Sequence, residues 1–204
     1  MAYVVSFSNQ KGGVGKTTSC VNLAAYIALS GYKVLLVDLD SQANASSALG
    51  VFDKKTENSI YTALCTGDIR PCIVKGADFD FVPSSRDLTG AELELNDKED
   101  REFVLKNVLS AVLDDYDYIF IDCAPSINLL LVNALTASKG VIIPLQCEYF
   151  ALEGMNQLLN TVRLVKKHLN PSIEIDGVLL TMCMRNKLAQ DVEKNVRSLF
   201  KSAV

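Results

Sequence analysis

The sequence predicts an α/β fold, a three-layer sandwich in which a mostly parallel central sheet is flanked by helices. Short runs rich in β-branched residues alternate along the chain with helical patterns, which is typical of strand–helix–strand units. Several runs are apolar throughout, as expected of strands covered on both faces. The length of 204 residues suits a single domain over residues 1–204. Ligands of such sheets bind at the carboxyl ends of the strands, so the residues after each run are the candidates for a site.

The alternation predicts six strands and four helices in order. The expected strands are 3–8, 33–38, 79–83, 118–122, 140–145 and 175–181. The expected helices are 17–30, 101–114, 151–169 and 188–200. Gly31 follows the first helix as a C-cap signal, and apolar residues at helical spacing form one stripe along 151–169.

The segment after the first predicted strand reads K-G-G-V-G-K-T-T and leads into a helix. Strand, glycine-rich loop and helix form the context of a phosphate-binding loop, in which backbone N–H groups and the helix dipole hold an anion. Lys16 is expected to reach the β- and γ-phosphates, Thr17 to ligate Mg²⁺ and Thr18 to bond the α-phosphate. The candidate nucleotide-binding residues are Lys11, Gly12, Gly13, Val14, Gly15, Lys16, Thr17 and Thr18.

This loop departs from two standard patterns. The pattern G-x-x-x-x-G-K-[ST] needs glycine where the chain has Gln10, and a dinucleotide fingerprint needs glycine where it has Thr18. A second lysine, Lys11, stands at the start of the loop instead. Lys11 and Lys16 repel each other electrostatically unless both bind phosphate. Lys11 precedes the glycines of the loop, so we expect that it cannot fold back onto its own nucleotide.

The motif K-G-G-x-G-K-T resembles that of the deviant Walker A ATPases, which include the ParA/Soj partition proteins and MinD. The resemblance implies a P-loop NTPase fold of the SIMIBI-like kind, with ATP and Mg²⁺ as cofactors. It also implies a homodimer that sandwiches ATP between two subunits. Lys11 would then reach the partner's nucleotide and stabilise transition-state charge, as an arginine finger does. Lys11, Lys16 and Asp40 are the expected catalytic residues.

Carboxylates follow two further predicted strands. The second strand ends in D-L-D-S-Q-A-N and the fourth in Asp122, which fits a Walker B carboxylate that holds Mg²⁺ through water. The resemblance assigns positioning of the attacking water to Asp40 and a metal-side supporting role to Asp38. Thr17, Asp38 and Asp122 are therefore the expected metal-side residues. The family usually has proline at the position of Ser41.

The segment 144–154, P-L-Q-C-E-Y-F-A-L-E-G, resembles the ParA/Soj branch rather than MinD. Glu148 is expected to contact the nucleotide or the partner subunit, or simply to belong to a helix N-cap region. The six cysteines form no C-x-x-C pair, which predicts reduced, mostly buried thiols rather than a zinc site. His168, the single histidine, is expected at the surface.

Charge is distributed unevenly along the chain. The net charge of −4 argues against a protein coated in positive charge for nucleic acid. Residues 160–204, however, hold eight Lys and Arg against four Asp and Glu, which leaves −8 on residues 1–159. The resemblance implies non-specific DNA binding by the C-terminal half, and an ordinary solvated basic face is the alternative. The candidate DNA-binding residues are Arg185, Lys187, Lys194, Arg197 and Lys201.

The resemblance predicts a ParA/Soj-type ATPase that dimerises on ATP, binds DNA and drives chromosome or plasmid segregation. A ParB-type partner would stimulate its slow hydrolysis. The expected location is the bacterial cytoplasm at the nucleoid, without stable membrane association. A MinD-like division-site regulator and a non-catalytic nucleotide-dependent regulator or repressor are the alternatives. Relatives are expected to continue about 50 residues further, in a final strand and helices that the chain would lack as a truncated form or a naturally short member.

Overall fold

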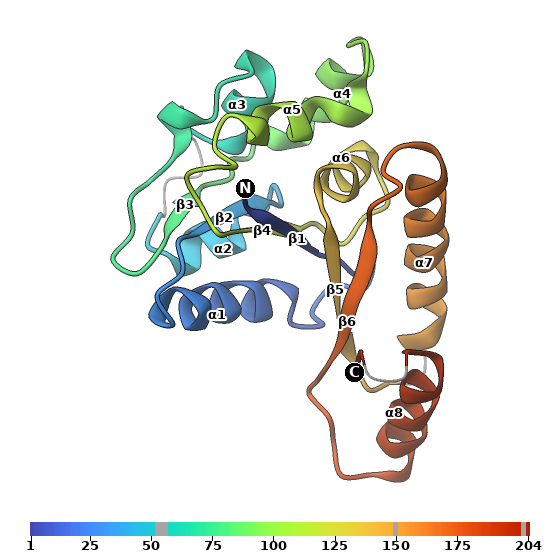
Figure 1. Ribbon diagram of the computed structural model, residues 1–204. Helices are drawn as coiled ribbons and strands as arrows, with labels where there is room; N and C mark the ends of the chain where they lie inside the picture. The colour runs from blue at the N-terminus through green and yellow to red at the C-terminus, as the bar shows by residue number, and fades with distance from the viewer. Residues whose placement is uncertain (52–56, 149–150, 201–202) are drawn as a thin grey trace.

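The computed structural model describes residues 1–51, 57–148, 151–200 and 203–204 (Figure 1). Six strands in these ranges form one sheet in the order β3-β2-β4-β1-β5-β6, and every pairing between them is parallel. The strands are β1 Tyr3–Phe7, β2 Val34–Leu39, β3 Asp80–Val82, β4 Tyr118–Cys123, β5 Gly140–Gln146 and β6 Glu174–Thr181. The predicted fold class is confirmed.

Helices cover both faces of the sheet. Helix α1 lies on one face, and α3, α5, α6 and α7 lie on the other (Figure 1). The helical elements are α1 Lys16–Leu29, α2 Asn44–Ala48, α3 Ile60–Thr66, η1 Arg70–Cys72, α4 Leu88–Asn96, η2 Arg101–Phe103, α5 Val104–Ser110, α6 Leu129–Ala137, α7 Ala151–His168 and α8 Lys187–Phe200. None of the helices within the described ranges is both long enough and apolar enough to cross a bilayer.

The two-residue period of the strands divides their side chains between two hydrophobic cores. In β2, Leu35 and Val37 pack into the core beneath α3 to α7, whereas Val34 and Leu36 pack into the core beneath α1. All six β2 residues are buried, which explains the apolar run over residues 34–37 that precedes Asp38.

The strand order places one set of strand ends next to one another. β1 lies between β4 and β5, and Asp122 of β4 is in register with both Phe7 of β1 and Asp38 of β2. The segments after β1, β2 and β4 therefore meet at the carboxyl edge of the sheet, where open α/β sheets bind their ligands.

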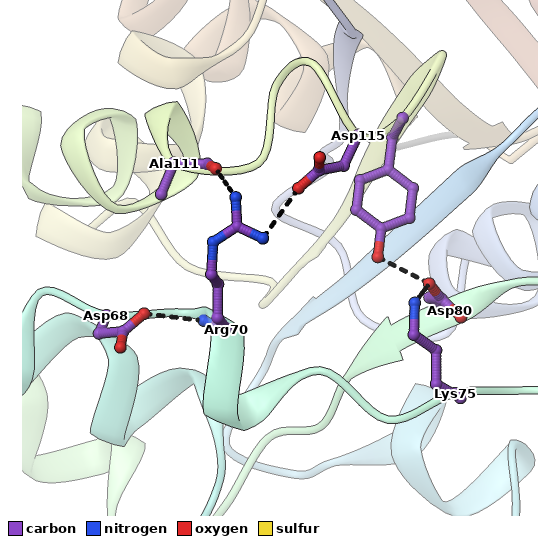
Figure 2. A network of polar contacts seen from close by, with 7 residues as sticks. Asp68, Arg70, Lys75, Asp80, Ala111 and Asp115 are labelled. Carbon is purple, nitrogen blue, oxygen red and sulfur yellow. Dashed lines mark hydrogen bonds and ion pairs between the residues drawn. The ribbon is translucent and has the colours of Figure 1, made fainter.

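A polar network joins segments at the amino-terminal ends of the strands, opposite the carboxyl ends described above (Figure 2). Arg70 forms an ion pair of 3.1 Å with Asp115 and donates a hydrogen bond of 2.6 Å to the carbonyl of Ala111. The hydroxyl of Tyr116 donates to Asp80 at 2.7 Å, and Asp80 also pairs with Lys75. These contacts join η1 and the start of β3 to the connection between α5 and β4.

Sequence patterns located the strands better than the helices. Each observed strand begins and ends within one residue of its predicted bounds. The helix predicted over 101–114 is a 3₁₀ turn, η2, followed by the shorter α5, and helices α2, α3, α4 and α6 were not predicted. Three of these four are short or polar, and α6 is apolar almost throughout, so none shows a clear one-sided stripe.

Candidate nucleotide-binding site

The loop between β1 and α1 has the backbone of a phosphate cradle. Gly13 has a φ of 75° and Gly15 a φ of 85°, a left-handed conformation that L side chains adopt only at a cost. Gly15 is the N-cap of α1, so the helix starts at Lys16 with its amide groups directed to the loop. A Cβ at Gly12 or Gly13 would meet no atom within 4 Å, which leaves open space above the cradle.

A pocket of about 840 Å³ lies over this loop, within the size range of small-molecule sites. It combines loop residues, the second-strand segment and the ends of β4 and β6. Its lining residues are Gly12, Gly13, Gly15, Lys16, Thr17, Thr18, Ser19, Val21, Asn22, Asp40, Gln42, Asn44, Ala48, Pro125, Thr181 and Met182. The sequence predicted Gly12, Gly13, Gly15, Lys16, Thr17, Thr18 and Asp40 among these.

Lys16 is buried beside two carboxylates. Its side-chain Nζ donates to the carbonyl of Lys11 at 3.2 Å, and the residue is 7% exposed. Burial lowers the pKa of Lys16, while the nearby charges of Asp122 and Asp40 act in the opposite direction. An ammonium group held in this way at a helix N-terminus favours a multiply charged anion as its ligand.

Asp122 is a buried carboxylate without a protein partner of ordinary hydrogen-bond geometry among the described residues. It is 1% exposed, and desolvation raises its pKa to about 7, although nearby Thr17 and Lys16 act to lower it. A buried carboxylate without such a partner lowers the stability of the fold when it is ionised, unless a cation or a hydrogen-bond donor pairs with it. A carboxylate, a threonine hydroxyl and space for water form the oxygen-rich donor set that Mg²⁺ prefers, so these residues fit the metal.

Asp38 and Asp40 lie differently although they are two residues apart. Asp38 is fully buried and accepts hydrogen bonds from the backbone N–H (2.8 Å) and hydroxyl (2.7 Å) of Ser46 and from the N–H of Asp40 (3.2 Å). Desolvation raises the pKa of Asp38 to about 6 against these hydrogen bonds. Asp40 lines the pocket and accepts from the N–H of Gln42 at 2.9 Å. Asp38 therefore fixes the loop that presents Asp40.

Lys11 lies at the edge of the loop and forms an ion pair with Glu148 beyond β5. Both side chains are partly exposed to solvent, and the second Glu148 oxygen accepts from Gln146. Lys11 and Val14 are the predicted loop residues absent from the described pocket lining. Val14 is buried, and its carbonyl accepts from the Thr181 hydroxyl at 2.8 Å.

The predicted basic region lies around the exposed face of α8. Arg185, Lys187, Lys194 and Arg197 are all exposed, and Arg197 pairs with Glu193 at 2.9 Å. Lys201 lies outside the described residues. His168 is exposed, as predicted.

Several pocket residues were not predicted from the sequence. Thr181 and Met182 come from the end of β6, Pro125 follows β4, and Asn22 lies one turn into α1. Asn22 is four residues after Thr18, the spacing of one helix face, which is a signal that could have identified it. The positions of Thr181 and Met182 depend on β6 lying two strands from β1, which local patterns do not encode.

Known proteins with similar sequences indicate the family to which the chain belongs. An AAA domain family matches residues 2–175. The chain is 50% identical to the sporulation initiation inhibitor protein Soj of Bacillus subtilis, over 100% of this chain and 82% of that protein. It is 46% identical to the chromosome partitioning protein ParA of Myxococcus xanthus, over 98% of this chain and 72% of that protein.

Solved structures show the same fold. A plasmid partition protein from Borrelia burgdorferi superposes with a TM-score of 0.87 at 31% identity, covering 99% of this chain and 87% of that one. The cobyrinic acid a,c-diamide synthase from Mycobacterium smegmatis, with bound ADP and magnesium, gives a TM-score of 0.92 at 37% identity, covering 98% and 83%. With its phosphate-binding loop and its similarity to Soj and ParA over nearly the full chain, this protein belongs to the ParA/Soj family of chromosome-partitioning ATPases.

Proposed function

We propose that the chain is a Mg²⁺-dependent ATPase that cycles between a monomer and an ATP-bound dimer on DNA and thereby drives DNA segregation. The observation that carries the proposal is the arrangement of Lys16, Thr17 and the buried carboxylate of Asp122 around one glycine loop, in which Thr17 and Lys16 both act on Asp122. Family membership and the nucleotide and magnesium bound by a relative of the same fold support it.

Each residue of the site has a separate role in this proposal. The loop N–H groups and Lys16 bind the phosphates, and Thr17 and Asp122 hold the metal directly or through water. Bound Mg²⁺ would supply charge neutralisation at the phosphates. Asp40, presented by the loop that Asp38 fixes, orients the attacking water. Hydrolysis of a phosphoanhydride requires mainly positioning and charge compensation, so a strong base is unnecessary.

Lys11 acts on the nucleotide that is bound by the partner subunit. It is bound to Glu148 outside the described lining of its own pocket, which supports a role towards a second nucleotide rather than its own. In the dimer, the Lys11 ammonium leaves Glu148 and compensates the negative charge that develops on the partner's ATP. The ion pair with Glu148 must open before this contact forms.

The basic face of α8 binds the DNA backbone in the dimer. Four exposed cations in and before this helix supply phosphate contacts, and doubling them in a dimer raises affinity through counterion release. A ParB-type DNA-binding protein stimulates hydrolysis and returns the chain to a weakly binding monomer.

Light scattering after size exclusion, with no nucleotide, ADP or ATP, tests the cycle. Asp40→Ala is expected to form a stable dimer only with ATP because bound ATP is no longer hydrolysed. Lys16→Ala should bind no nucleotide, and Lys11→Gln should bind ATP but remain monomeric. Lys106→Gln, an exposed lysine on α5 far from the loop in sequence, is the matched control and should dimerise as the parent does.

Three results would overturn parts of the proposal. ATP-dependent dimers of Lys11→Gln at parental yield would exclude a role of Lys11 across the dimer. ATP-dependent binding to anionic vesicles but not to DNA would favour a MinD-like membrane regulator. Binding of ATP without turnover, in the presence of DNA, would favour a non-catalytic regulator.

A further inference from the structure

Two cysteine side chains meet beside the nucleotide pocket. The Sγ atoms of Cys147 and Cys183 lie 3.0 Å apart, and both thiols are free. Cys147 follows the end of β5 and Cys183 follows the end of β6, where Gln146 and Thr181 are paired in register. Bond formation needs the sulfurs to approach by about 1 Å, to the disulfide length of about 2 Å.

The two thiols differ in exposure and therefore in reactivity. Cys147 is 7% exposed, and Cys183 is exposed to solvent. Burial, followed by the contact with Cys183, raises the pKa of Cys147 to about 12, so Cys147 keeps its proton at neutral pH. Because the thiolate is the reactive form and oxidants arrive from solvent, Cys183 is the thiol that meets an oxidant first.

The other cysteines offer no comparable pair. Cys20, Cys72 and Cys123 are buried, and the exposed Cys65 donates to a carboxylate oxygen of Glu94 at 3.1 Å.

We propose that Cys183 and Cys147 form a peroxide-sensitive modification site that closes to an intramolecular disulfide at the edge of the nucleotide pocket. The Cys183 sulfur attacks one oxygen of hydrogen peroxide, the O–O bond breaks, and a sulfenic acid and one water form. The Cys147 thiol then attacks the Cys183 sulfur as it gives up its proton, the S–O bond breaks, and the departing hydroxide takes up that proton to form a second water. Two thiols are oxidised by two electrons and one peroxide is reduced to two waters.

The bridge would join two segments that contact the phosphate-binding loop. Cys147 directly precedes Glu148, which holds Lys11. Cys183 follows Met182, a residue of the pocket lining with a φ of 49°, and Thr181, whose hydroxyl bonds the carbonyl of Val14. A bond between these segments restricts the movement that frees Lys11 from Glu148. This consequence rests on the proposed function, and the oxidised chain is expected to lose ATP-dependent dimerisation.

Counting thiols in the denatured protein tests the modification itself. After treatment of the folded chain with stoichiometric hydrogen peroxide, the number of titratable thiols should fall from six to four. A non-reducing gel should still show a monomer, and peptide mass spectrometry should find Cys147 linked to Cys183. A crosslinked dimer, an unchanged thiol count or a different linked pair would overturn the proposal.

Three single substitutions separate the two thiols. Cys183→Ser removes the thiol that reacts first with peroxide, so Cys147 has no partner and all five remaining thiols should still be titratable after the same treatment. Cys147→Ser should stop at the sulfenic acid of Cys183, which a dione reagent traps. Cys65→Ser removes the other exposed thiol and should still form the bridge. Loss of two thiols in folded Cys183→Ser would contradict the assignment even if Cys147→Ser fails to fold.

Light scattering with ATP, on reduced, oxidised and re-reduced protein, tests the consequence. The oxidised form should remain monomeric, and a dithiol reductant should restore the dimer, whereas Cys183→Ser should dimerise before and after peroxide. If the reduced parent does not dimerise with ATP, the proposed function fails while the thiol count still decides the modification. If the bridge forms and dimerisation is unchanged, the restriction of Lys11 is wrong.

Discussion

Asp122 shows how a single residue combines a functional role with a cost to stability. Its carboxylate is buried at the end of β4, and its pKa is raised from 3.8 to about 7, chiefly by desolvation. A carboxyl group with a raised pKa keeps its proton in the folded chain at pH values where the unfolded chain has lost it. As pH rises from about 4 to about 7, Asp122 ionises in the unfolded chain while it stays protonated in the folded one, which lowers the free energy of unfolding. A bound metal would offset that loss.

Asp122→Asn is expected to stabilise the nucleotide-free protein. At pH 8 the variant should gain on the order of 4 kcal/mol in the free energy of unfolding, because the pKa of Asp122 is raised from 3.8 to about 7 and each pKa unit corresponds to about 1.4 kcal/mol. Near pH 4 the gain should disappear, since the parent carboxyl is then largely protonated in the unfolded chain as well as in the folded one. Urea denaturation across this pH range measures the difference. Asp38 also has a raised pKa, and its charge helps to raise the pKa of Asp122, so the measured difference includes the coupling between the two carboxylates.

The control for this prediction is Asp97→Asn, an exposed carboxylate, which should leave the pH profile unchanged. The Asp122 variant should at the same time lose Mg²⁺-dependent ATP binding. A variant that is less stable than the parent at pH 8 would contradict the assignment of Asp122 as an unpaired buried carboxylate.

Ser46 connects three segments through one hydroxyl. It donates to Asp38 at 2.7 Å and accepts from the backbone N–H of Ser84 at 2.9 Å. Ser46→Ala leaves the buried Ser84 N–H without this acceptor, and it should lower the free energy of unfolding by about 1–3 kcal/mol. Ser47→Ala is the matched control, because the hydrogen bond that the Ser47 hydroxyl donates to a described residue goes to the Ala43 carbonyl in its own helical turn. Equal losses for both variants in urea denaturation would exclude the connecting role.

The proposed phosphate-binding loop acts at the scale of an element, because its backbone N–H groups, rather than one side chain, would bind the phosphates. Gly13→Ala forces a side chain into a positive φ of 75°, which costs about 1–2 kcal/mol and displaces the N–H groups of the cradle. We expect the variant to fold but to lose at least tenfold in affinity for a fluorescent ATP analogue, measured by titration.

Gly67→Ala is the matched control for the loop glycine. Gly67 has a φ of 82°, ends α3 away from the pocket and has open space around a Cβ. The substitution carries the same backbone penalty and should not change ATP affinity. A similar loss of affinity in both variants would show that Gly13→Ala acts through general destabilisation.

The elements differ in how far the sequence predicts them. Short runs rich in β-branched residues, several of them apolar throughout, located the described strands, and the glycine pattern located the left-handed loop before α1, because both depend on local patterns. Helix α6 was not predicted because its buried residues lie around nearly the whole helix. Without a polar face, its sequence lacks the alternation of apolar and polar residues that indicates a helix. Thr181 enters the pocket only through the long-range pairing of β5 with β6.

At the scale of the whole molecule, the uneven charge favours one orientation on a polyanion. Residues 1–159 carry −8 and residues 160–204 carry +4, so DNA should approach the end of the molecule that holds α8. Lys194→Glu is expected to weaken ATP-dependent DNA binding and to reduce its salt slope by about 1, as loss of one phosphate contact does. Filter binding at several salt concentrations measures both values.

Lys106→Glu changes the net charge by the same amount on an exposed position of α5. It should weaken DNA binding much less and should leave the salt slope unchanged. Equal effects of the two substitutions would mean that total charge, and not the α8 face, determines binding.

The central position of β1 has a consequence for the order in which the chain acquires its structure during synthesis. β1 leaves the ribosome before the other described strands, yet its neighbours in the sheet are β4 and β5. Phe7 of β1 can pair with its register partner Asp122 only after that residue has been made. Contacts so distant along the chain form late. The glycine loop therefore emerges more than a hundred residues before Asp122, the carboxylate proposed for its metal side, so a nascent chain lacks the proposed metal side of the site until Asp122 has been made.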